Sequence, residues 1–567
     1  MKKLERAFLP KNFHLQNWES VENYFNLLMG VKLEDENDVE AWLQDVSELA
    51  AVLSENLAWR YINTTRETDN LEFQAKYQEF VNEIYPNVAK AWDEVYDKLL
   101  SYSKLSELEN KGYHTYIRKI AADKRLFRKE NLQPIADAAN LAQEYSKIMG
   151  SLSVLIRDEE YTSEEAQALL SEPDRDLREE TYYALNKARF EESEDVDILL
   201  NELISKRSLI AKNAGFNSFL DYQFVSLNRF DYTVQDCQKL HESIKNQTLP
   251  LLNKVYQDKA KALGLDSLRP WDIYVDSSNK EVLKPTKNTE ELLQKSKLIL
   301  GKVDSSFVEV IESMEELGHL DLGNRMGKAP GGYNYPLYES GVPYIFMNAV
   351  GHQSDLTTFI HESGHAVHSV LSSTQSITGF KELGSEIAEL ASMSMELFTM
   401  EHWDVIFNEE ELKRAKRHQI EKILMILPHV AAIDKFQHWI YVNPEHTLQE
   451  RRNAWLDILA ELSSSEVNWF GLDRFKRQSW QSVPHIFSVP LYFVEYAIAQ
   501  LGAVAMWKNY KLDPKETIRK YKEALSLGSS KTIPEMYETA GIKFDFSEDY
   551  VAELSTFLYQ EYQALNE

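Results

Sequence analysis

The sequence predicts a large, mainly α-helical protein, and three observations lead to this fold class. Its 567 residues exceed what one small hydrophobic core can serve, so two or more lobes are expected. Glycine (20 residues) and proline (16 residues) are both used less than average, which favours long helices with few turns. Apolar side chains also recur at helical spacing along much of the chain.

The first 150 or so residues predict a helical lobe. Apolar positions between Val39 and Leu57 mark one face of a long helix, with Asn37 or Asp38 as its candidate N-cap. A second stripe, from Phe73 to Ile84, predicts another helix that Pro86 stops. The many aromatic residues of this region are typical of a packed core, and no catalytic cluster is found among them.

The next region carries clearer helix boundaries. Thr162 and Glu165 have the spacing of a capping box, the Glu172-Pro173 pair interrupts the helical pattern, and Gly215 is a candidate C-cap. Further on, the stretch from Leu268 to Val275 is interpreted as a loop that enters a short strand.

The best strand candidate of the chain is the segment Val342–Asn348, which is rich in β-branched and aromatic residues. Because Pro343 lies within it, we expect an edge strand. An edge strand just before the histidine-rich helix could pair with an extended peptide backbone. A plain edge strand without a ligand is an equally good interpretation of this pattern.

The sequence His361-Glu362-Ser363-Gly364-His365 has the H-E-x-x-H pattern of zinc hydrolases. Residues i and i+4 share one face of a helix, so both imidazoles can bind one ion while Glu362 reaches a bound water. The flanks predict a helix with Ser354 or Asp355 as its cap. The alternative is an ordinary amphipathic helix with two histidines that are hydrogen-bonded elsewhere.

A third ligand is available on a second predicted helix, which Ser385 could cap. Apart from its glutamates this helix is apolar or small on every side, which indicates burial. Glu386, Glu389 and Glu396 share one face of it, and a buried carboxylate is costly unless it is paired or bound to metal. One of these carboxylates would complete a two-His, one-Glu site with an open position for water. The alternative is a solvated acidic face.

A further cluster of polar side chains lies near the C-terminal third. His485 precedes Tyr492 and Tyr496, whose spacing lets both hydroxyls point the same way on a helix. Neutral donors of this kind stabilise a tetrahedral oxyanion. Spacing alone favours core tyrosines. Upstream, Leu427-Pro428-His429 is expected to open a helix, and His438 is interpreted as a core histidine.

Composition excludes several classes of function. The formal net charge of −28 argues against nucleic acid as a partner, because phosphate binding needs a basic surface. Cys237 is the single cysteine, so no intramolecular disulfide can form, and a reducing compartment is expected. The first residues carry charges where a signal peptide needs its apolar run, and no apolar stretch approaches a membrane span. We therefore expect a cytoplasmic protein without a membrane partner.

Taken together, these segments resemble peptidase family M3, in its oligoendopeptidase F branch. The resemblance rests on three motifs, which are the stretches 361–368, 386–392 and 490–502. It implies a mostly helical, two-lobed, clam-like enclosure with a small sheet beside the zinc helix. It also implies an N-terminal helical lobe over residues 1–185 and a catalytic domain over residues 186–567.

Carried over residue by residue, the resemblance implies a site for one Zn²⁺ ion per chain and a glutamate general base. Glu386 and Glu396 then become candidates for orienting the ligating imidazoles, and His368 a supporting residue. The implied zinc ligands are His361, His365 and Glu389, the base is Glu362, and the transition-state donors are His485, Tyr496 and Tyr492.

The implied function is zinc-dependent hydrolysis of internal bonds in short, unstructured peptides. Two alternatives remain at this point. One is a zinc carboxypeptidase or dipeptidyl carboxypeptidase on a similar scaffold, which would act only at a free C-terminus. The other is a non-catalytic helical peptide-binding protein. The oligomeric state and the cleavage preference do not follow from the sequence.

Overall fold

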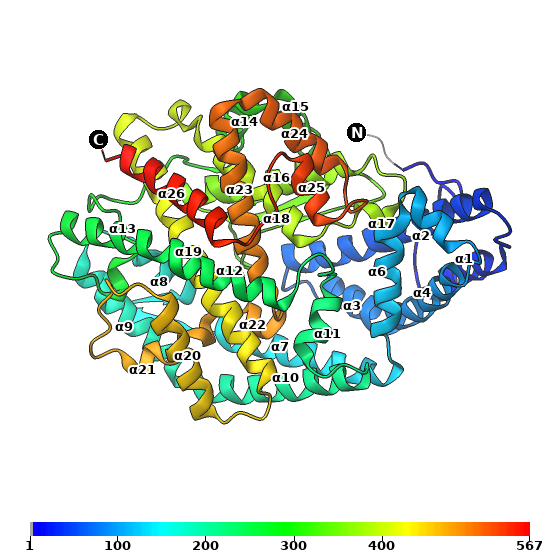
Figure 1. The fold of residues 1–567 in the computed structure, drawn as a ribbon, viewed down its shortest axis with the longest axis horizontal. Helices are drawn as coiled ribbons and strands as arrows, with labels where there is room; N and C mark the ends of the chain where they lie inside the picture. The colour runs from blue at the N-terminus through cyan, green and yellow to red at the C-terminus, as the bar shows by residue number, and fades with distance from the viewer. Residues whose placement is uncertain (1–3, 567) are drawn as a thin grey trace. The chain divides into compact units, whose positions relative to one another are not determined.

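The computed structural model describes residues 4–566 and is mainly α-helical with two small sheets, as predicted (Figure 1). The chain forms two compact units, each built from three separate stretches of sequence. Unit 1 comprises residues up to 124, 284–408 and 502–544, and unit 2 comprises 125–283, 409–501 and the residues from 545 onward. Within the described residues, no helix is both long and apolar enough to cross a membrane.

Unit 1 contains the predicted zinc helix and a three-stranded sheet. Its helices are α1 (Glu19–Gly30), α2 (Glu36–Arg66), α3 (Leu71–Glu79), α4 (Tyr85–Leu100), α5 (Leu105–Leu108), most of α6 (His114–Leu126), α14 (Thr289–Val303), α15 (Ser305–Glu316), α16 (Gln353–Ser372), α17 (Thr378–Lys381), α18 (Ser385–Met400), α24 (Pro514–Ser526) and α25 (Ile533–Thr539). Its strands are β3 (Leu320–Gly323), β4 (Tyr333–Tyr335) and β5 (Tyr344–Ala349).

Unit 2 is helical apart from one hairpin. Its helices are α7 (Leu132–Gly150), α8 (Ser163–Leu169), α9 (Arg175–Glu191), α10 (Ser193–Asn213), α11 (Phe219–Ser226), α12 (Val234–Gln247), α13 (Leu249–Ala262), α19 (Glu409–Val442), α20 (Leu448–Leu462), α21 (Asp473–Lys476), α22 (His485–Ser488) and α26 (Glu548–Ala564). Its strands are β1 (Ser153–Ile156) and β2 (Glu159–Thr162), and α23 (Val494–Leu512) begins in unit 2 and ends in unit 1.

The N-terminal helices pack around one apolar core in unit 1. Val39, Trp42 and Leu49 of α2 are fully buried there, so the predicted long helix is confirmed. Its cap is Asp35 rather than the predicted Asn37 or Asp38, because the Asp35 side chain accepts from the Asp38 N–H in a capping box.

The predicted stop at Pro86 is wrong. A π-helical turn, Phe80–Ile84, follows α3, and α4 begins at Tyr85 with Pro86 in its first turn. Proline is tolerated there because the π-helical turn interrupts the regular i to i−4 bonding just before it, with the Tyr85 N–H bonded to the Phe80 carbonyl.

The strand predicted over 342–348 is confirmed as β5, but its predicted place at a sheet edge is wrong. The sheet order is β3-β5-β4, so β5 is central, parallel to β3 and antiparallel to β4. Pro343 lies just before the strand and interrupts no ladder bond. The edge strand next to β5 is β4, with Asn334 opposite Ile345.

In unit 2, the capping box of Thr162 and Glu165 and the break before α9 are confirmed. Gly215 follows the end of α10 with φ +82°, as expected for a helix C-terminus. The strand expected near Leu268–Val275 is absent, since those described residues form a 3₁₀ turn, Pro270–Asp272. Pro428 does not open a helix either, because it lies inside the 34-residue α19.

Candidate metal centre

Helix α16 holds the two motif histidines on one face. His352 is its N-cap, whereas the sequence suggested Ser354 or Asp355. The Asp355 carboxylate instead accepts from three successive N–H groups, those of residues 350–352, and so fixes the strand-to-helix turn. The rings of His361 and His365 lie 4.9 Å apart between centroids, as expected for positions i and i+4.

Gly364 allows α16 to pack very closely on α18 (Figure 1). A Cβ atom at this position would lie 2.6 Å from the Cα of Ser392 and 3.0 Å from the Ala391 carbonyl oxygen. The two helix backbones therefore touch at this glycine. This close crossing places the glutamates of α18, which begins at Ser385 after Gly384 as N-cap, beside the histidines of α16.

The structure brings together one ligand atom from each of His361, His365 and Glu389, all within 4.8 Å of one another. The Nε2 atom of His361 lies 3.4 Å from a carboxylate oxygen of Glu389. Two imidazoles and one carboxylate are a donor set that Zn²⁺ commonly uses in catalytic sites. The donor set and its convergence therefore fit a Zn²⁺ ion with a position left for water.

Hydrogen bonds to groups of α18 orient both imidazoles. The Nδ1 atom of His361 lies 2.7 Å from Glu396, and the ring of His365 hydrogen-bonds the backbone of Ala388. Burial acts to lower the pKa of His361, but its bonds to Glu389 and Glu396 outweigh this and hold the pKa well above the ordinary value. Burial lowers the pKa of His365 to about 4, so this ring is neutral and its lone pair is available.

Glu362 is buried beside these ligands. Burial raises the pKa of its carboxyl to about 7, and the negative Glu389 adds to the shift while His361 opposes it. The backbone of Asn334, on the edge strand β4, hydrogen-bonds this carboxylate. The Oε2 atom has no hydrogen-bond partner among the described residues, which suits a group that takes a proton from a water molecule.

His368, the supporting residue, is fully buried and does not join the ligand group. Burial lowers the pKa of its imidazole to about 3. Neither ring nitrogen has a hydrogen-bond partner among the described residues. A neutral, apolar-packed ring of this kind supports the helix without supplying charge.

The predicted donor cluster forms within unit 2. The Tyr496 hydroxyl lies 3.4 Å from His485 Nε2, and the Tyr492 and Tyr496 rings are 5.4 Å apart between centroids. Tyr492 precedes α23 rather than lying on it, after Leu491 with φ +65°. Phe493 packs at 4.9 Å against the His485 ring. All three polar side chains are partly exposed.

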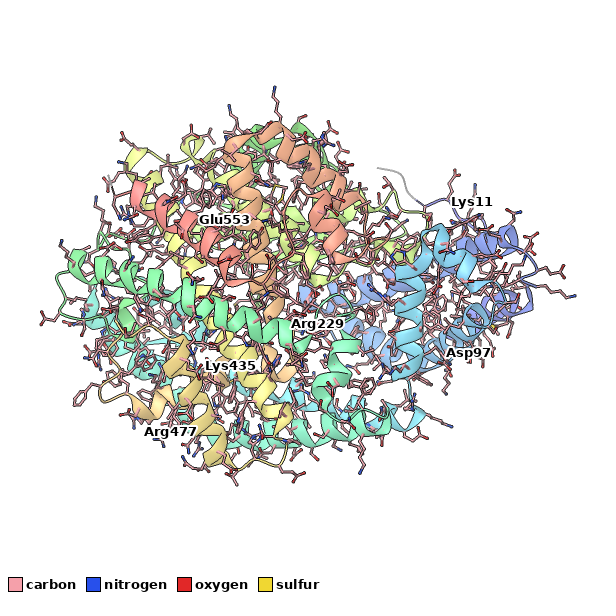
Figure 2. All side chains as sticks on the ribbon, viewed as in Figure 1. Lys11, Asp97, Arg229, Lys435, Arg477 and Glu553 are labelled. Atoms are coloured by element: carbon pink, nitrogen blue, oxygen red, sulfur yellow. The ribbon has the colours of Figure 1, made fainter. Side chains whose placement is uncertain are left out.

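Buried polar side chains hold the segment that carries Tyr492. Arg229, labelled in Figure 2, donates at 2.6 Å to the Leu491 carbonyl and at 2.7 Å to the Glu495 carboxylate. The Gln437 side chain accepts from the Leu491 N–H at 2.7 Å. A strained residue persists only where its surroundings fix it, and these bonds do so for Leu491.

Cys237, Asp434 and His438 form another buried group whose ligand atoms lie within 4.8 Å of one another. Asp434 already binds His241 Nε2 at 2.8 Å, and His438 lies 3.3 Å from the same carboxylate. These pairs join α12 to α19 inside unit 2. We interpret the group as a structural network, because its carboxylate already has two imidazole neighbours.

Three contributors to the centre were not predicted from the sequence. Gly364 occupies a variable position of the motif, and its importance appears only once α18 is placed against α16. Asn334 lies on a three-residue strand that is too short to recognise, although the Tyr-Asn-Tyr alternation around it is typical of a strand. Ser392, which donates to the Glu389 backbone carbonyl at 3.0 Å, is an ordinary helix residue by sequence.

Comparison with known proteins identifies related sequences over most of the chain. The model described as peptidase family M3 matches residues 168–556, and the model described as peptidase M3 N-terminal domain matches residues 8–127. An oligoendopeptidase F homolog of Lactococcus lactis is 23% identical over 552 residues, covering 90% of this chain and 87% of its own. An oligoendopeptidase F homolog of Borreliella burgdorferi is 24% identical, covering 75% and 73%.

A solved structure shares the fold over nearly the whole length. It is that of PZ peptidase A with an inhibitor, with a TM-score of 0.90 and 24% identity. The alignment covers 98% of this chain and 99% of the other.

Proposed function

Because the chain belongs to peptidase family M3, and is therefore a metallopeptidase, we propose that it is a zinc-dependent oligoendopeptidase that hydrolyses internal bonds of short, unstructured peptides. The observation that carries the proposal is the convergence of His361, His365 and Glu389 within 4.8 Å beside the unpartnered Oε2 atom of Glu362. One Zn²⁺ ion per chain would be held by the first three residues. When bound, zinc supplies an acidified water and a polarised substrate carbonyl.

The remaining chemistry belongs to the residues of this chain. Glu362 accepts the proton of the attacking water at its free carboxylate oxygen and passes it to the leaving amine. The pKa of about 7 lets this carboxyl exchange a proton near neutral pH. Glu396 holds the His361 ring in the orientation that presents Nε2, by its 2.7 Å bond to Nδ1.

We assign His485 and Tyr496 as hydrogen-bond donors to the oxyanion, with Tyr492 as the third candidate. Their support is the mutual packing of the three rings inside unit 2 and their partial exposure.

We also propose that β4, the edge strand, pairs with the peptide backbone. This replaces the role expected of β5, which is central in the sheet. An edge strand offers unpaired backbone groups, and β4 is the strand that contacts Glu362 through Asn334. A peptide held along β4 would therefore pass beside the general base.

We place the activity in the cytoplasm, because the lone, buried Cys237 forms no internal disulfide and suits a reducing compartment. The test of the whole proposal is incubation with a mixed peptide library, with and without a chelator, followed by mass analysis of the fragments. Chelator-sensitive internal cleavage supports it. Products released only from free C-termini would indicate a carboxypeptidase, and no turnover at all would indicate a peptide-binding protein.

A further inference from the structure

Unit 2 contains a large cavity that the catalytic scheme does not use. Its volume is about 470 Å³, which is in the range of pockets that bind small organic ligands. It lies between α9, α19, α20 and the segment 467–482, and its walls are mostly apolar and aromatic. The aromatic side chains that line it include Tyr182, Tyr274, Trp455, Trp469 and Phe475.

One cation lines this cavity. Among its described lining residues, Arg189 is the only Lys, Arg, Asp or Glu side chain, and His429 is neutral because burial lowers its pKa to about 4. Arg189 lies in the last turn of α9, on the stripe formed by Tyr182, Leu185 and Asn186, which also line the cavity. The sequence therefore places a guanidinium on the apolar face of this helix.

Arg189 makes no side-chain hydrogen bond or ion pair to any described residue, and its Nε atom is buried without a partner. The groups that act on its charge are the hydroxyls of Tyr145, Tyr274 and Tyr182, which are neutral at ordinary pH. The chain has a net charge of −28, yet no carboxylate among the described residues pairs with this cation. A partly buried, uncompensated guanidinium is costly unless a ligand supplies the anion.

The cavity wall is continuous with the proposed donor cluster. The His429 ring, which lines the cavity, packs edge-on against Phe493 at 5.8 Å. Phe493 in turn contacts the rings of His485 at 4.9 Å and Tyr496 at 5.5 Å. One aromatic ring thus separates the wall of the cavity from the residues assigned to the oxyanion, all within unit 2.

We propose that this cavity receives the C-terminal residue of a peptide substrate, with its α-carboxylate on Arg189 and its apolar or aromatic side chain against the aromatic wall. This inference rests on the proposed function and names the part of the peptide that is recognised. The planar guanidinium matches a carboxylate with two parallel hydrogen bonds. The α-carboxylate is the one anion that every unmodified linear peptide carries, whereas an acidic side chain is the second possible source.

A fixed anchor for the C-terminus has a consequence for where peptides are cut. An extended peptide advances about 3.3 Å per residue, so a carboxylate bound in this cavity sets how many residues lie between it and the carbonyl held by the proposed donors of the same unit. Peptides that are lengthened by adding residues only at the N-terminus should therefore be cut at a constant number of residues from the C-terminus. Peptides with an amidated end should lose this constancy and still be cut.

Binding can be measured apart from turnover with the zinc-loaded Glu362→Gln protein and isothermal titration calorimetry. The probes are one peptide ending in phenylalanine as free acid, the same peptide as C-terminal amide, and that amide with glutamate as the penultimate residue. We expect the free acid to bind about 10- to 100-fold more tightly than the amide, as a charge-assisted pair would give. Introducing Arg189→Gln into the Glu362→Gln protein should abolish the difference in affinity between acid and amide. Introducing Arg189→Lys instead should keep part of this difference.

Arg474 provides a matched control. It is exposed and lies over the rings of Phe190 and Phe475, which line the cavity, but it does not line the cavity itself. Arg474→Gln should leave the acid-to-amide ratio unchanged. A purely structural role of Arg189 at the end of α9 would change affinity for all three probes equally.

Four results would overturn the inference: equal affinity for acid and amide, a ratio that survives Arg189→Gln, a glutamate amide that binds as well as the free acid, or no peptide binding at all. The constant cleavage distance in the unmodified enzyme tests the same anchor without any variant. If turnover fails but the acid-to-amide ratio depends on Arg189, the proposed function is wrong and the anchor stands.

Discussion

The Nδ1 atom of His361 and the Oε1 atom of Glu396 lie 2.7 Å apart and join α16 to α18. The opposite ring nitrogen, Nε2, lies 3.4 Å from Glu389. Before metal binds, these two carboxylates favour a protonated imidazole, which is why the pKa of His361 lies well above its ordinary value. Zinc bound at the proposed site would therefore compete with a proton for the same nitrogen.

This competition predicts a pH-dependent metal affinity. With the pKa of His361 raised, the ring carries a proton at neutral pH, and zinc must displace it. The apparent affinity for zinc should rise about tenfold per pH unit until the raised pKa is passed, and then level off. Competition with a chromophoric chelator measures this. Glu396→Gln removes one carboxylate partner of His361, so the zinc affinity of this variant should level off at a lower pH. An unchanged dependence of zinc affinity on pH would contradict the role of Glu396.

Removing a ligand should remove the metal. His361→Ala and Glu389→Ala should each contain well below one zinc per chain and show no peptidase activity, because two remaining ligands hold zinc weakly. Elemental analysis of the purified variants checks this. Glu386→Ala is the control on the same helix and should keep its zinc. Full zinc in Glu389→Ala with none in Glu386→Ala would mean that the wrong glutamate has been assigned.

Glu362→Gln should keep zinc and peptide affinity and lose nearly all turnover. The amide has the same shape as the carboxyl but cannot accept the proton of water, and general-base catalysis contributes about 100- to 10,000-fold. Stopped-time assays with a fluorogenic peptide give kcat, and calorimetry gives affinity. A kcat within a few-fold of the original enzyme would refute the role of Glu362.

Gly364→Ala tests the close helix crossing. The added Cβ would lie 2.6 Å from the Ser392 Cα, so α16 and α18 must separate, which should lower the free energy of unfolding by about 1–3 kcal/mol. The shift should also weaken zinc binding, because Glu389 lies on the displaced helix. Gly30→Ala is the control, since no atom lies within 4 Å of its added Cβ. Thermal unfolding of the zinc-loaded proteins compares the two.

Substrate length gives the last prediction. If the site lies inside an enclosure, as the family resemblance implies, only short extended chains reach it. Peptides of up to about 20 residues, at about 3.3 Å each, should be cleaved efficiently, and casein should remain nearly intact at the same enzyme concentration. Rapid internal cleavage of casein, absent in the Glu362→Gln control, would refute the enclosure while leaving the metal chemistry standing.

The spacing of the two motif histidines was enough to predict that their side chains converge, but spacing could not identify the third ligand. His361 and His365 follow from helical geometry alone. Glu389 did not follow from spacing, because Glu386 and Glu396 share its face, and it was singled out only by the family resemblance. Glu396 was one of two glutamates expected to orient an imidazole, and the structure shows it bonded to His361. Which of the two reaches His361 depends on the crossing of two helices, which no local pattern contains.

The error in the sheet arose because strand-pairing partners are not encoded locally, and the errors at two prolines have a different cause. The segment of β5 has a clear strand composition, yet its neighbours β3 and β4 are too short to recognise, so a central strand was predicted as an edge. Pro86 and Pro428 were expected at helix ends. The first is tolerated in a first turn, and the second lies within α19, where surrounding packing outweighs the lost hydrogen bond.

The single cysteine offers a way to follow unfolding of one unit by itself. Cys237 is fully buried in α12 of unit 2, whereas the proposed metal ligands lie in unit 1. A thiol reagent reacts only when the sulfur becomes accessible, so its rate reports the opening of unit 2. Release of zinc to a dye reports the opening of unit 1. Coincidence of the two signals along a denaturant titration would show that the chain unfolds as one cooperative body, and separation would show two.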